Sequence, residues 1–134
     1  MADVIYNNFK EAIMNGSIDL DTDTIKVALV TSAYTPDQDA HDFFDDITNE
    51  VSGTGYSAGG ATLANKAVSQ DNTDNEGVFD ADDVTWSTST ITARGAVIYK
   101  STGVASTSPL ICYLDFGSDK VSTAGTFTIS WNAE

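Results

Sequence analysis

Residues 84–134 decide the fold and read VTWSTSTITARGAVIYKSTGVASTSPLICYLDFGSDKVSTAGTFTISWNAE. Segments rich in Val, Ile, Thr and aromatic residues alternate here with Ser-, Thr- and Gly-rich segments, a pattern typical of strands joined by turns. Phe127, Ile129 and Trp131 alternate with polar residues, which indicates a strand with one buried face. We predict four strands in this stretch: 84–86, 90–100, 109–116 and 126–131.

These strands supply the expected hydrophobic core. The apolar alternation slips near Arg94 and Gly95, which indicates a β-bulge. The best-alternating apolar positions are expected to be buried: Trp86, Val97, Tyr99, Ile111, Tyr113, Phe127 and Ile129.

The N-terminal part predicts one helix and further strands. Ile5, Phe9, Ala12 and Ile13 recur at helical spacing, so we expect a helix over about 4–15, with Asp3 as N-cap and Gly16 just after its end. Further strands are expected over 24–31, 61–70 and 78–79, with a short one at 18–20 and one helical turn at 42–47. The sequence therefore predicts a mainly β, single antiparallel β-sandwich-like domain spanning 1–134, with strands from about 18 to 131.

The charge pattern argues against several classes of partner. The chain has 134 residues and a net charge of −14, and only three of its twenty acids lie in residues 84–134. The six basic residues are scattered, so neither nucleic acid nor an anionic membrane is an expected partner. The N-terminus lacks the charged and apolar regions of a signal peptide, and no apolar run approaches membrane-spanning length. We expect a product of a host cytoplasm.

Few residues suggest catalysis. His41, the only histidine, lies in an acidic loop, and Cys112 lies in an apolar strand, where we interpret it as a small buried hydrophobic residue. Asp115 is an acid beside an apolar run and is expected to end a strand. We expect no enzymatic activity, no catalytic residue and no cofactor.

Calcium binding is the best chemical alternative, because the ion prefers hard oxygen ligands and acids cluster twice. The spacing does not fit an EF-hand, because Thr24 stands at the glycine position of that loop. A solvated acidic face without a metal is therefore the preferred interpretation. The candidate ligands are Asp19, Asp21, Asp23, Asp71, Asp74 and Glu76.

Loop aromatics and glycines of the N-terminal half are candidates for contacts with other subunits. The glycine-rich segment 53–60 lacks the spacing of a phosphate-binding loop. Exposed aromatics also suit sugar binding, although packing or a subunit contact is the better interpretation. The interface candidates are Ile5, Phe9, Tyr34, Phe43, Phe44, Tyr56, Gly59 and Gly60.

Five segments together resemble small structural proteins of tailed bacteriophages. They read ADVIYNNFK at 2–10, YSAGGATL at 56–63, VTW at 84–86, ARGAVIY at 93–99 and PLICYLDFG at 109–117. The resemblance covers most of the chain and rests on scaffold motifs.

That resemblance implies a virion structural protein, with decoration or cementing of the outer surface of the head as the expected role. It also implies location in the virion, contact with the major capsid protein or other virion proteins, and a homo-oligomer or many copies on a symmetric shell. The alternatives are a tail, collar or fibre-attachment protein, and a glycan- or calcium-dependent binding module.

Overall fold

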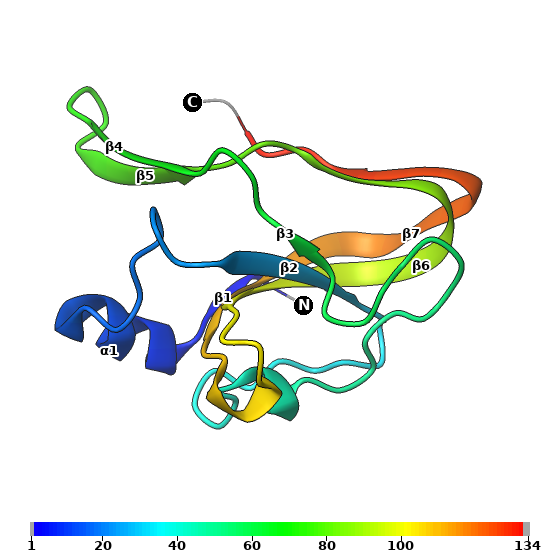
Figure 1. The fold of residues 1–134 in the computed structure, drawn as a ribbon, viewed down its shortest axis with the longest axis horizontal. Coiled ribbons are helices and arrows are strands. Elements are labelled where there is room, and N and C mark those ends of the chain that lie inside the picture. The colour runs from blue at the N-terminus through cyan, green and yellow to red at the C-terminus, as the bar shows by residue number, and fades with distance from the viewer. Residues whose placement is uncertain (1, 133–134) are drawn as a thin grey trace.

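Two long strands dominate the fold. A computed structural model describes residues 2–132, in which β6 (Val84–Lys100) and β7 (Leu110–Ile129) pair antiparallel along most of their length (Figure 1). The four strands predicted for this stretch are therefore two continuous ones. The segments between them are bends within a ribbon, where the strand pairing changes register but does not end.

The bends fold the β6–β7 ribbon back over itself, so that it contributes to two layers (Figure 1). The upper layer contains residues 84–92 and 121–129, and the lower layer contains residues 95–100 and 110–115. One of four register shifts lies between Ala93 and Gly95, which confirms the predicted bulge. Thr88, Gly117 and Ala124 have positive φ angles along the same ribbon, which lets the strands turn a corner.

The lower layer is widened by three shorter strands. The sheet order is β1 (Val4–Ile5), β7, β6, β2 (Ile25–Val30) and β3 (Ala61–Thr62). The near-continuous apolar sequence of β2 suits a strand that is covered on both faces, and five of its six residues are buried. The mainly β, antiparallel, sandwich-like class with one helix is confirmed.

The buried residues form two clusters, one on each face of the lower layer. All seven predicted core residues are buried. Trp86, Ile111, Phe127 and Ile129 belong to the cluster between the two layers. Val97, Tyr99 and Tyr113 belong to a second cluster on the other face of the lower layer.

The second cluster is covered by irregular chain. Two 3-10 turns, η1 (Phe44–Asp46) and η2 (Ala105–Thr107), lie side by side below the lower layer (Figure 1). The η1 turn confirms the predicted helical turn at 42–47. The irregular segments therefore serve as a third, thinner layer.

The N-terminal helix is shorter than expected. The helix α1 spans Asn7–Asn15, because Val4–Ile5 pairs with β7 as a strand. Asp3 is not the N-cap. Its carboxylate accepts a hydrogen bond from the backbone N of Asp115 (2.7 Å), and Tyr6 takes the N-cap position. Gly16 ends the helix in the left-handed conformation, as predicted.

The predicted strand over 61–70 is also divided. Only β3 joins the main sheet, and β4 (Ala67–Asp71) pairs with β5 (Glu76–Asp80) in a separate two-stranded sheet. The expected strand at 18–20 is irregular chain that leads into a turn at 20–22. The β4–β5 hairpin, residues 67–80, projects from one end of the molecule and is called the arm below (Figure 1).

Candidate interaction surface

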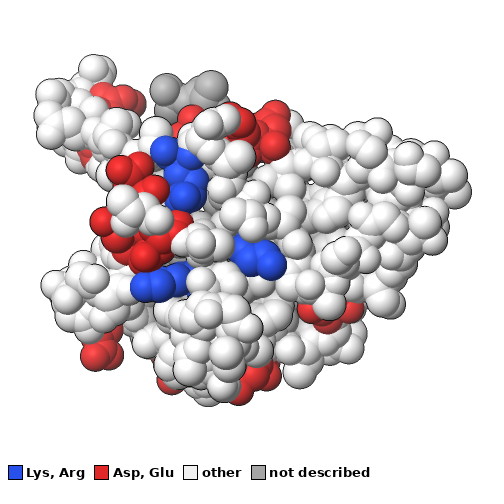
Figure 2. Space-filling view, viewed as in Figure 1, with Lys and Arg blue, Asp and Glu red and all other residues white. Residues whose placement is uncertain are grey.

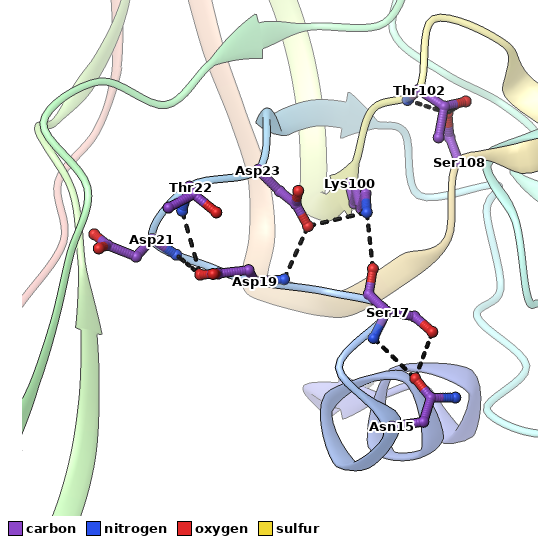
Figure 3. A network of polar contacts seen from close by, with 9 residues as sticks. All are labelled: Asn15, Ser17, Asp19, Asp21, Thr22, Asp23, Lys100, Thr102 and Ser108. Carbon is purple, nitrogen blue, oxygen red and sulfur yellow. Dashed lines mark hydrogen bonds and ion pairs between the residues drawn. The ribbon is translucent and has the colours of Figure 1, made fainter.

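The first group of calcium candidates stabilises its own loop (Figure 3). The Asp19 carboxylate accepts hydrogen bonds from the backbone N atoms of Asp21 (3.0 Å) and Thr22 (3.3 Å). The Asp23 carboxylate accepts one from the backbone N of Asp19 (2.8 Å) and pairs with Lys100 Nζ at 3.0 Å. The backbone bond and the lysine both lower the pKa of Asp23. Asp21 points away from this network (Figure 3).

The second group lies at the tip of the arm. Asp71 Oδ1 accepts hydrogen bonds from the backbone N atoms of Thr73 (2.7 Å) and Asp74 (3.2 Å), which lowers the pKa of its carboxyl. These are bonds of a turn, with the carboxylate in the place of a backbone acceptor. Within residues 2–132, no three His, Cys, Asp or Glu side chains gather in a way that would hold a metal ion.

His41 completes a chain of buried hydroxyl groups. The Tyr6 and Tyr34 hydroxyls lie 2.7 Å apart, and the Tyr34 hydroxyl lies 2.9 Å from His41 Nδ1. The backbone N of Asp37 also donates to Nδ1, so that nitrogen is an acceptor and Tyr34 donates to it. The histidine ring stacks on Tyr34, with centroids 5.7 Å apart. These contacts give His41 a role in holding its loop.

The surroundings of Cys112 and Asp115 also indicate structural roles. Burial raises the pKa of the Cys112 thiol to about 12, which leaves it protonated near neutral pH. Asp115 was expected to end a strand, but it lies within β7 opposite Gly95 and binds Arg94. That expectation was wrong because β7 continues through the bend.

Several interface candidates are not available at the surface. Tyr34 is only 1% exposed, so its side chain belongs to the second core cluster. Phe44 is half-buried and stacks on Tyr99 with ring centroids 4.1 Å apart. Phe43 is half-buried and forms a β-bridge with Pro109. The expected exposed phenylalanine pair is therefore replaced by loop packing against the body.

The glycine-rich segment is likewise tied to the sheet. The Tyr56 hydroxyl donates to Glu50 Oε1 (2.7 Å) and accepts from the backbone N of Leu29 (3.0 Å). Gly59 accepts a hydrogen bond from the Tyr99 hydroxyl at 2.6 Å. Gly60 lies directly against the backbone of β2. These contacts hold the segment against the sheet within one chain.

The other two of the eight interface candidates, Ile5 and Phe9, lie on or just before α1. Ile5 is 51% exposed on the short edge strand β1. Phe9 is half-buried, because one side of its ring packs against the main core.

A different set of apolar side chains lines a groove between α1 and the arm. Val68 on β4 is 56% exposed and Ile13 on α1 is 44% exposed. The groove has a volume of about 470 Å³ and is lined by Ile13, Gly16, Ile18, Asp19, Leu20, Asp21 and Val68. Sequence reasoning missed Val68, because it was placed within one continuous strand over 61–70 and not in a separate hairpin.

The register of the arm explains why Val68 faces the groove. Val68 pairs directly with Phe79, so the two side chains lie on the same face of the hairpin. Phe79 packs against the main core, so this face of the arm is turned toward the body. Val68 lies on this face as well, where it lines the open groove and stays 56% exposed.

Charge divides the molecule into two ends. Figure 2 shows acidic side chains around the arm and the loop beneath it, with basic side chains among them, while the surface over the β6–β7 bend is almost free of charge on this side. Residues 84–92 and 121–131 contain no charged residue. The groove therefore opens at the acidic end.

Comparison with known proteins finds no matching family model, no matching curated protein and no matching solved structure. No helix among residues 2–132 has the length and apolar character needed to cross a membrane.

Proposed function

We propose that this chain is a structural protein of a tailed-bacteriophage virion, bound in many copies to the outer surface of the head as a decoration or cement protein. The scaffold motifs that resemble phage structural proteins support the family. The arm supports the assembly role and is the observation that carries the proposal.

The arm is hard to explain in a subunit that works alone. A two-stranded sheet by itself is only marginally stable in water, and this one has no third strand among the described residues. Four of the five residues of β4 are exposed. Phe79 packs against the main core, but Val68 on the same face of the hairpin is 56% exposed. Packing against a neighbouring protein would bury Val68 and add to the support that Phe79 gives. An arm that gains stability on binding suits a subunit added to a preformed shell.

The acidic surface is consistent with attachment to the outside of a head. A net charge of −14 keeps a free subunit soluble and repels it from packaged nucleic acid. It also favours contact with basic patches of a shell protein. Attachment carried by such charge pairs weakens as salt screens them, over a Debye length of about 8 Å at physiological ionic strength.

The test uses particles of the phage that encodes this chain. Purified virions are separated into heads and tails, and the copies of this protein are counted against the major shell protein. Heads that lack it are then mixed with purified protein. We expect a fixed, high ratio to the shell protein and saturable rebinding to heads. A few copies confined to tails would overturn the decoration role in favour of a tail or collar protein, and absence from particles would overturn both.

A further inference from the structure

We infer that the groove between α1 and the arm is the site where a basic segment of the shell protein binds, with one apolar side chain of that segment inserted beside Val68. This inference rests on the proposed virion function and specifies the surface and the chemistry of the partner.

The apolar part of the groove comes from three separate segments. Ile13 projects from α1, Ile18 and Leu20 come from the following loop, and Val68 comes from β4. A volume of about 470 Å³ lies within the range of about 300–1,000 Å³ that is typical of binding pockets. An aliphatic or aromatic anchor in this groove would remove both Ile13 and Val68 from water, and such buried anchors dominate the energetics of most interfaces.

The charged part of the lining selects the partner. Among residues 2–132, Asp19 and Asp21 are the only charged side chains that line the groove. The Asp19 carboxylate accepts hydrogen bonds from backbone N atoms of its own loop. The Asp21 side chain makes no hydrogen bond or ion pair within the described part of the chain, and it turns toward the side of the arm (Figure 3). A Lys or Arg next to the apolar anchor would pair with Asp21.

A second copy of this chain is a poor occupant for the same reason. Its surface carries the same excess of acids, so two copies meeting at this end would repel each other. Another groove, beside β7, is lined by Phe116, Val121 and Lys120 among others, and its charge has the opposite sign. That groove supplies a matched control, because Val121 is a comparably exposed strand valine (65%) on β7, in the uncharged stretch 121–131.

The first experiment measures attachment to heads that lack the protein. We expect Val68→Glu to weaken attachment at least tenfold, and Val121→Glu to bind like wild type. We also expect Asp21→Asn to weaken attachment severalfold and to reduce its salt dependence, whereas Asp45→Asn, at an exposed site in η1, leaves both unchanged. Thermal melting of each variant shows that the fold is retained.

The outcomes separate the two proposals. If wild type does not attach to heads, the decoration role fails and this inference fails with it. If wild type attaches and Val68→Glu attaches equally well, the groove is not the site, although the decoration role stands. Equal loss with Val68→Glu and Val121→Glu also overturns the inference, because attachment then does not depend on this groove in particular.

A second experiment identifies the segment that binds in the groove. A photo-crosslinking amino acid replaces Val68, decorated heads are irradiated, and the crosslinked peptide is sequenced. The expected product is a shell-protein segment with a large apolar residue flanked by Lys or Arg. Crosslinking to another copy of this chain, or to an acidic segment, would overturn the inference.

Discussion

Arg94 and Asp115 form an ion pair across the bend of the β6–β7 ribbon. Arg94 Nε donates to Asp115 Oδ1 at 2.8 Å, and the Asp115 side chain is only 4% exposed. The pair lies at the register shift between Ala93 and Gly95, where the strands pass from one layer to the other. The guanidinium, together with the backbone N of Gly117, holds the pKa of Asp115 well below its usual range.

The lowered pKa of Asp115 predicts a specific loss of stability in acid. A carboxyl whose folded pKa lies below the unfolded value of about 3.9 stabilises the fold above that pH, and the stabilisation is lost as pH falls toward the folded pKa. Asp115→Asn should therefore lower the melting temperature most above about pH 4, with the difference from wild type shrinking below it. Melting curves from pH 2 to 7 check this, with Asp45→Asn as control. A difference that stays constant with pH would contradict the assignment.

The buried hydroxyl chain predicts unequal effects of removing its members. Tyr34→Phe leaves the Tyr6 hydroxyl without its partner in a fully buried position, which should cost about 1–3 kcal/mol. Tyr6→Phe should cost less, because the Tyr34 hydroxyl still donates to His41. Urea unfolding measures both, and the double variant should cost less than the sum of the single ones. Equal effects of the two single variants would contradict this arrangement.

All five tyrosines should titrate abnormally. Burial raises the pKa of each one, to about 12 for Tyr34 and Tyr99. A raised tyrosine pKa stabilises the fold at pH values below the unfolded pKa of about 10. This stabilisation is lost as the pH rises through the folded pKa. Tyrosinate absorbance should therefore stay low near pH 10 and appear together with loss of the circular dichroism signal at higher pH. Smooth titration near pH 10 with the fold intact would be inconsistent with these buried positions.

Gly60 should be far less replaceable than Gly103. Both have positive φ angles, 76° and 87°, so an alanine at either costs roughly 1–2 kcal/mol of backbone strain. A Cβ at Gly60 would also collide with the carbonyl group of Val27, whereas one at Gly103 meets nothing within 4 Å. We expect Gly60→Ala to cost roughly 2–5 kcal/mol in chemical denaturation. Similar costs at the two sites would mean that the 53–60 segment does not pack on β2.

Phe127 should be a major contributor to stability. Its ring packs between the layers, edge-on to Trp86 with centroids 6.1 Å apart. Phe127→Ala should cost about 3–5 kcal/mol, because it removes buried area and leaves a cavity. Val121→Ala, at an exposed position on the same strand, should change the unfolding free energy by less than about 1 kcal/mol. Unchanged melting of Phe127→Ala would show that the two layers do not share this core.

The sequence by itself determined the class of fold and the identity of the core. The alternation of Phe127 and Ile129 with polar residues, and the apolar run 25–30, are local signals, because side chains alternate between the two faces of a strand whatever it pairs with. The bulge at Arg94 and Gly95 and the helix end at Gly16 were predictable for the same reason. Each depends on the conformation of one or two residues.

Only the tertiary structure decided which loop residues are covered. Tyr34, Phe44 and Tyr56 lie in segments without periodicity, and their burial depends on partners 27 to 55 positions away. The joining of predicted strands into β6 and β7 is also a long-range result, because a bulged bend and a turn look alike until the pairing partner is known. The exposure of Val68 is likewise a long-range result. The sequence predicts a strand there, but β4 pairs only with β5, in a sheet separate from the main one, and leaves that side chain over an open groove.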